Sequence, residues 1–90
     1  MPNVPESTLT IVYLARLREV LGRASEAWPL TGPTSAGAIR DALRKRDATW
    51  AHELADGRAV RLAVNQAIAS PSTLVHPGDE LAFLPPVTGG

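Results

Sequence analysis

The sequence lacks cysteine altogether. This absence excludes disulfide bonds and thiolate metal sites, and it excludes covalent chemistry through a cysteine of this chain. An excess of either charge is missing as well, because nine basic side chains balance nine acidic ones. We therefore expect neither a nucleic acid nor a membrane surface as a partner.

Long apolar runs are also missing, since the longest are far shorter than a bilayer span. The first residues, from Met1 to Glu6, lack the basic start and the apolar stretch of a signal peptide. A cytoplasmic protein is therefore expected. Hydrophobic residues make up 44% of the sequence, an ordinary share for a folded protein, and 90 residues are enough for one small domain.

The first half of the chain predicts two strands and two helices. Residues 8–14 are β-branched and aromatic and predict a strand, and residues 24–30 predict a weaker one. Residues 15–22 place apolar side chains at helical spacing before a glycine. The main helix is expected over residues 35–47, with Ser35 as its N-cap. Its apolar stripe comprises Ala38, Ile39, Ala42 and Leu43.

The second half predicts a short helical segment around Trp50 and Leu54, followed by strands. The strands are expected over residues 59–64, 67–69 and 80–84. Asn65 and Gln66 predict a tight connection between the first two of these, because asparagine tolerates left-handed backbone geometry. Pro85 and Pro86 end the last strand, because neither can donate a hydrogen bond to a neighbouring strand.

This order of elements predicts an α+β fold, a roll in which one mixed sheet carries the main helix on one face. Residues 1–7 are expected to form a loose N-terminal extension. Residues 8–86 would form the folded domain, and residues 87–90 would form a C-terminal tail.

The tail has a composition that suits acyl chemistry. It comprises Val87, Thr88, Gly89 and Gly90 and directly follows Pro85 and Pro86. The two glycines alone would also suit a frayed end, but the double proline would project the tail stiffly from the sheet. Because glycine has no Cβ, the backbone could thread a narrow channel and the Gly90 carbonyl could be approached closely. A carboxylate there becomes electrophilic once its oxygen is made a good leaving group, as in an acyl-adenylate.

Other candidate sites are weak. His52 and His76 have no carboxylate or thiol at convincing ligand spacing, so no metal site is expected. Asp79 and Glu80 would face opposite ways in a strand, which makes them a poor acid–base pair, and Asp79 is expected in a turn.

Basic residues crowd the outer face and the end of the main helix, at Arg40, Arg44, Lys45 and Arg46. We interpret them as a solvated helix face that suits the helix dipole, with a docking surface as the alternative. Trp28 and Trp50 are expected in the core. The sequence has no phosphate loop or nucleotide fingerprint, so the chain is not expected to bind ATP by itself.

The segment from Asp79 to Gly90, with its Pro-Pro-Val-Thr-Gly-Gly ending, closely resembles the MoaD family, the small subunits of molybdopterin synthase. The stretch Ala63-Val64-Asn65-Gln66, preceded by Asp56-Gly57, is similar to that family's central strand and turn. Trp50 and residues 15–19 fit the family as well. The resemblance covers residues 8–90, whereas residues 1–7 carry no family signal.

The resemblance implies a ubiquitin-like β-grasp fold and a sulfur carrier. An E1-like activating enzyme would adenylate Gly90 with ATP, and a sulfur donor protein would convert it into a thiocarboxylate. Gly89 and Gly90 would then enter the large subunit of the synthase, which would supply the catalytic side chains, and the sulfur would pass to precursor Z. The implied complex is a heterotetramer, and the carrier itself would bind no cofactor. The lack of cysteine agrees, since the sulfur would be held on the terminus.

The alternation of strand residues predicts a partner surface. Thr10 and Glu80 are polar and mark the outer face of the first and last strands. The apolar residues expected on that face are Val12, Leu14, Ala82 and Leu84. We expect them to be exposed near the root of the tail and, together with residues 85–88, to contact the large subunit. The alternative is that the Trp50 segment or loops cover this patch.

Three other functions remain open. A thiamine-pathway sulfur carrier has the same fold and also ends in Gly-Gly. A ubiquitin-like modifier would join Gly90 to lysines of target proteins. The carrier and the modifier share the activation step and differ in the attacking group, which is sulfur in one and an amine in the other. A simple binding module with an incidental tail would keep its function after deletion of Gly90.

Overall fold

The computed structural model describes residues 7–85, and the predictions for residues 1–6 and 86–90 lie outside the described residues. The strands are β1 (Thr8–Tyr13), β2 (Ser25–Pro29), β3 (Thr34–Ser35), β4 (Arg61–Val64), β5 (Ala67–Ala69), β6 (Leu74–Val75) and β7 (Glu80–Leu84). The helices are α1 (Arg16–Leu21), α2 (Ala36–Arg44), α3 (Ala48–Glu53) and the 3-10 turn η2 (Asp56–Arg58).

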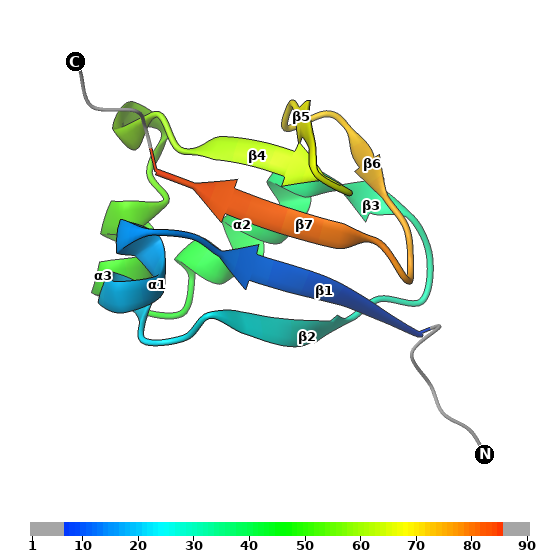
Figure 1. The fold of residues 1–90 in the computed structure, drawn as a ribbon, viewed down its shortest axis with the longest axis horizontal. Helices are drawn as coiled ribbons and strands as arrows, with labels where there is room; N and C mark the ends of the chain where they lie inside the picture. Colours follow the sequence, from blue (N-terminus) through cyan, green and yellow to red (C-terminus); the bar gives the residue numbers. More distant parts are fainter. Residues whose placement is uncertain (1–6, 86–90) are drawn as a thin grey trace.

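The main sheet has five strands in the order β2-β1-β7-β4-β5. The central pair, β1 and β7, runs parallel, and every other neighbouring pair in this sheet is antiparallel. Figure 1 shows α2 crossing behind the sheet, with α1 and α3 at the end toward which β1 and β7 both point. First and last strands side by side, with a helix across one face, make the α+β roll that the order of elements predicts and the β-grasp fold that the resemblance implies.

The alternation of residues along the two central strands sorts them onto two faces, as predicted. Leu9, Ile11 and Tyr13 of β1 point to the helical side and are fully buried. Leu81 and Phe83 of β7 are also fully buried on that side. The hydrophobic core therefore lies between this inner face and the three helices.

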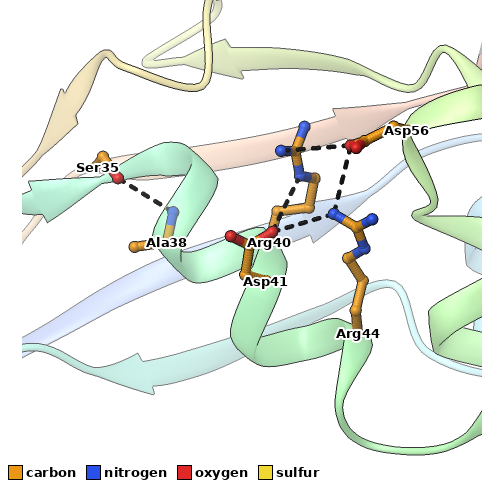
Figure 2. A network of polar contacts seen from close by, with 6 residues as sticks. All are labelled: Ser35, Ala38, Arg40, Asp41, Arg44 and Asp56. Carbon is orange, nitrogen blue, oxygen red and sulfur yellow. Dashed lines mark hydrogen bonds and ion pairs between the residues drawn. The ribbon is translucent and has the colours of Figure 1, made fainter.

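The N-terminus of α2 confirms the predicted cap, since the Ser35 hydroxyl accepts the Ala38 N–H at 3.1 Å (Figure 2). Ile39 and Leu43 are buried as expected, but Ala38 is exposed, so that part of the predicted stripe is wrong. Ala36 is buried in its place, because it lies three and seven positions before Ile39 and Leu43 and so shares their face of the helix.

The sequence does not predict two short strands, β3 and β6. β3 and β6 form a separate two-stranded sheet, pairing Thr34 with Val75 and Ser35 with Leu74. Strands of two residues are too short to show alternation, and the flanking prolines and glycine indicated only turns. The segment around Trp50 does form a short helix, α3. Trp50 is buried in the core as predicted, Leu54 is buried beside it, and Trp28 is only partly buried against the core.

Replacing Phe83 with alanine should destabilise the fold strongly, because the ring is fully buried against the aromatic core. The expected loss in the free energy of unfolding is about 3–5 kcal/mol, measured by urea denaturation. Ile68→Ala is the matched control, since this side chain is 67% exposed, and its change should stay within about 0.5 kcal/mol. Equal losses in the two variants would contradict the assignment of the inner and outer faces.

Candidate functional site

The last described residues leave the sheet at its centre. Leu84 ends β7, which lies between β1 and β4, and the Leu14 N–H donates to the Phe83 carbonyl at 3.1 Å just beyond the end of β1. Pro85 follows and is half-buried. Pro86 and the predicted tail residues Val87, Thr88, Gly89 and Gly90 lie outside the described residues. The base of the tail is therefore held by two neighbouring strands.

An aromatic stack anchors this base from the inner face. The rings of Phe83 and Tyr13 lie parallel, with centroids 5.9 Å apart and an interplanar angle of 14°. Trp50 meets Tyr13 edge to face at 5.4 Å. Such pairs stabilise beyond the burial of area alone. The stack couples α3 to both central strands.

The buried Tyr13 hydroxyl donates a hydrogen bond to the Glu26 carboxylate of β2, which satisfies its hydrogen-bonding capacity. Burial and this hydrogen bond raise the pKa of Tyr13 well above its usual value. Burial would also raise the pKa of Glu26, but hydrogen bonds from Arg46 and Tyr13 outweigh it and hold that pKa below its usual value. Both residues therefore keep their ordinary ionisation at neutral pH.

Polar contacts also fix the start of β7. The Asp79 carboxylate accepts the His76 backbone N–H at 2.8 Å and the Asn65 side-chain amide at 3.1 Å, which confirms Asp79 as a turn residue. These hydrogen bonds lower the pKa of Asp79, and the bond from Asn65 has the larger effect. Asn65 in turn accepts the Glu80 N–H at 2.9 Å. Asn65 and Gln66 have φ of 49° and 72°, the left-handed geometry predicted for this tight turn.

The outer face of the sheet carries an apolar patch at the base of the tail. Leu14 is 37% exposed, and Val12 and Leu84 are half-buried. Ala82 is only 4% exposed, so the prediction that it is exposed is wrong. Its short side chain lies between Val12 on β1 and Ala63 on β4, directly opposite it in the register, and these neighbours cover it.

The sequence analysis missed two members of this patch. Ala63 pairs with Ala82 on one side and with Ile68 of β5 on the other, so all three share the outer face. Ile68 is among the most exposed large apolar side chains in residues 7–85. The alternation of residues 59–64 and the two-residue turn could have placed Ile68 opposite Ala63. We call the set Val12, Leu14, Ala63, Ile68, Ala82 and Leu84 the outer-face patch.

The basic residues of α2 do not form a purely solvated face, which corrects that prediction. Figure 2 shows Asp56 close to Arg40 and Arg44, with Asp41 on the opposite side of the same guanidinium groups. Arg44 donates to Asp41 at 3.0 Å and to Asp56 at 3.4 Å. Arg46, beyond the helix, lies 4.5 Å above the Trp50 ring and donates two hydrogen bonds to Glu26.

No cluster of histidine and acidic side chains within residues 7–85 could hold a metal ion. His52 and His76 are both exposed, and His76 is engaged in the turn with Asp79. Within the same residues, no helix is long and apolar enough to cross a membrane.

One acidic side chain is buried near the end of the sheet where β7 stops. Glu53 of α3 is 4% exposed and receives two hydrogen bonds from Arg16 of α1 and a third, at 3.4 Å, from Arg58 of η2. The hydrogen bonds from Arg16 are the main reason that the pKa of Glu53 is lowered, and their effect is larger than the opposite effect of burial. This ion pair ties α1, α3 and η2 together beside the base of the tail.

A model of the ThiS family matches residues 11–90. This chain belongs to the ThiS family. It is 36% identical over 83 residues to the molybdopterin synthase sulfur carrier subunit of Haemophilus influenzae, a match covering 91% of this chain and 99% of that one. It is 35% identical over 82 residues to the subunit of the same name from Escherichia coli, with the same two coverages.

Among solved structures, this ThiS-family chain is similar to SAMP1, the small archaeal modifier protein 1 of Haloferax volcanii. The crystal structure of that protein superposes with a TM-score of 0.75 at 26% identity, covering 92% of this chain and 99% of that chain. The likeness supports the β-grasp assignment over the whole described domain.

The lowered pKa of Glu53 predicts an acid-sensitive fold. The folded protein binds fewer protons than the unfolded chain around the usual glutamate pKa of 4.5, so Glu53 stabilises the fold above this value. That stability should be lost as the pH falls through the lower pKa of the folded state. Glu53→Gln should therefore unfold more easily at neutral pH and show a weaker loss of stability between about pH 7 and about pH 3.

Urea denaturation across this pH range checks the prediction. Glu19→Gln is the matched control, because Glu19 is exposed and makes no ion pair within residues 7–85. The control should follow the parent protein. A Glu53→Gln variant with the parent's pH profile would show that the Arg16–Glu53 pair contributes nothing to the acid sensitivity.

Proposed function

We propose that this chain is the sulfur-carrier subunit of a molybdopterin synthase. The observation that carries the proposal is the likeness to two proteins of that name over 91% of the chain. The outer-face patch at the base of the tail supports it, because a carrier has to dock on the proteins that load it and unload it. Neither of these two relatives is named as a thiamine-pathway carrier, so that alternative is not favoured.

The proposed chemistry takes place at Gly90. An E1-like activating enzyme would consume ATP and convert the Gly90 carboxylate into an acyl-adenylate. Sulfide delivered by a sulfur donor protein would then attack the carbonyl carbon and form a C–S bond. The bond to the AMP oxygen would break, and AMP would leave a Gly90 thiocarboxylate behind. Gly89 would let the tail pass through a narrow channel of the large subunit, because it lacks a Cβ. The thiocarboxylate would give its sulfur to precursor Z, with catalytic side chains from the large subunit and no cofactor bound to this chain.

The proposed docking surface for the large subunit is the outer-face patch, continued by Pro85 and the tail. Its apolar side chains lie on the sheet face opposite the helices, so a partner can cover them without disturbing the core. Arg61 lies opposite Leu84 in the register and is exposed, which places a positive charge at the rim of the patch. One carrier on each subunit of a large-subunit dimer would give a heterotetramer.

A second candidate function is protein modification. The likeness to SAMP1 favours it, since that protein is named a small archaeal modifier protein. Activation of Gly90 would be the same, but a lysine amine of a target protein would attack the acyl group. The two functions therefore differ in the product formed after activation.

Intact-mass measurement tests the proposal at its first step. The protein, its activating enzyme, ATP and a sulfur donor should yield a species in which one oxygen of Gly90 has been replaced by sulfur. A variant lacking Gly90 is the control and should keep its original mass. Conjugates to other proteins in place of the sulfur adduct would favour the modifier, and a wild-type protein that never gains sulfur would refute the carrier.

The docking surface predicts a loss of binding without a loss of folding. Leu14→Asp combined with Leu84→Asp should abolish binding to the large subunit in calorimetry, because both carboxylates would have to be buried in an apolar interface. Val20→Asp is the matched control, since Val20 of α1 and Leu14 are both 37% exposed and Val20 lies outside the patch. Undiminished affinity in the double variant would remove the patch from the interface.

A further inference from the structure

Lysine is almost absent from this chain. Eight of the nine basic side chains are arginine, and Lys45 is the one lysine in the sequence. A guanidinium stays protonated in proteins, whereas an ammonium can lose its proton and become a nucleophilic amine. Among these 90 residues, Lys45 is therefore the single side-chain amine that can attack an activated acyl group.

Lys45 is exposed and available. It caps the C-terminus of α2 through its backbone N–H, and its side chain makes no ion pair or hydrogen bond to the rest of residues 7–85. A cation at this position also suits the helix dipole. Arginine would serve that purpose equally, so the dipole alone does not explain why a lysine stands here.

Both neighbours of Lys45 are held by acidic partners, and one of them, Arg46, needs a guanidinium. Arg44 spans Asp41 and Asp56 from one nitrogen, as Figure 2 shows. Arg46 places two nitrogens on the two oxygens of Glu26, at 2.8 and 2.7 Å, while its plane covers Trp50. A lysine could not reproduce this fork and stacking. The flanking charges are thus held in place, and only the Lys45 amine is left to solvent.

We infer that Lys45 is the acceptor at which an activated copy of this chain is attached to a second copy when no sulfur nucleophile intercepts it. The inference rests on the proposed activation of Gly90. The unprotonated Lys45 amine attacks the Gly90 carbonyl of the acyl-adenylate, and a C–N bond forms. The bond from the carbonyl carbon to the AMP oxygen breaks, AMP leaves with the electron pair, and the nitrogen loses its extra proton to solvent.

The near absence of lysine then limits self-acylation. A carrier with nine surface lysines would expose nine side-chain amines to its own acyl-adenylate, whereas this chain has one. The expected product is a single species, an isopeptide-linked dimer joined from Gly90 to Lys45. Sulfur transfer and this self-conjugation compete for the same adenylate, so the supply of the sulfur donor decides between them.

The test incubates the full chain with its activating enzyme and ATP in the absence of a sulfur donor. The expected result is a covalent dimer whose yield rises with protein concentration. Its tryptic digest should contain a Lys45 peptide that carries residues 62–90, because Arg61 is the last site for trypsin in the sequence. Lys45→Arg keeps the charge at the helix end and should lose the dimer completely.

A second measurement separates this inference from the proposed function. With a sulfur donor present, the parent protein and Lys45→Arg should gain the Gly90 thiocarboxylate equally. If the thiocarboxylate forms with the sulfur donor but no Lys45-linked dimer forms in the reaction without it, the inference alone is overturned. A dimer that persists in Lys45→Arg, or a monomer cross-linked to itself, would also overturn it. Failure of both products would overturn the proposed function and the inference together.

Discussion

The parallel pairing of β1 with β7 is the constraint on which the rest of the structure depends. It brings the first and last strands to the centre of the sheet, in a register that sets Ile11 beside Leu81 and Tyr13 beside Phe83. Their inner faces bury the core, and their outer faces leave an apolar surface free. Because β7 is central, the chain continues from the middle of the sheet, next to that surface. The end proposed to carry the sulfur is thereby attached to the centre of the sheet.

Polar contacts around this pair are made chiefly by arginine. Glu26 and Glu53 lose solvent on folding, and each regains charge-assisted hydrogen bonds from the forked guanidinium of Arg46 or Arg16. Removing one partner would leave a buried charge uncompensated, which costs more than the pair contributes. The same preference for arginine leaves the chain with a single side-chain amine. Structural stability and the proposed acyl chemistry at Gly90 therefore favour the same side chain.

Local patterns predicted most of the fold. The β-branched run at 8–14, the Ser35 cap and the Asn65-Gln66 turn each act over a few residues, and the structure confirms all three. Features set by distant neighbours were beyond such patterns. Ala82 is covered by side chains from two other strands, and Arg46 is held by Trp50 and Glu26 from separate elements. Four of the six residues of the outer-face patch follow from the pleat of the first and last strands. Ala63 and Ile68 are missed, because the alternation is not carried across the predicted turn at Asn65 and Gln66.

The central claim is that the folded domain presents a sulfur-bearing terminus to the large subunit. The most direct test supplies that terminus chemically, as a purified Gly90 thiocarboxylate, and measures the conversion of precursor Z to molybdopterin by the large subunit without ATP or activating enzyme. The account predicts one sulfur lost from the carrier for each sulfur gained by the product, and no product from the plain carboxylate. Equal product from both forms, or a thiocarboxylate that survives unchanged beside the large subunit and precursor Z, would contradict it.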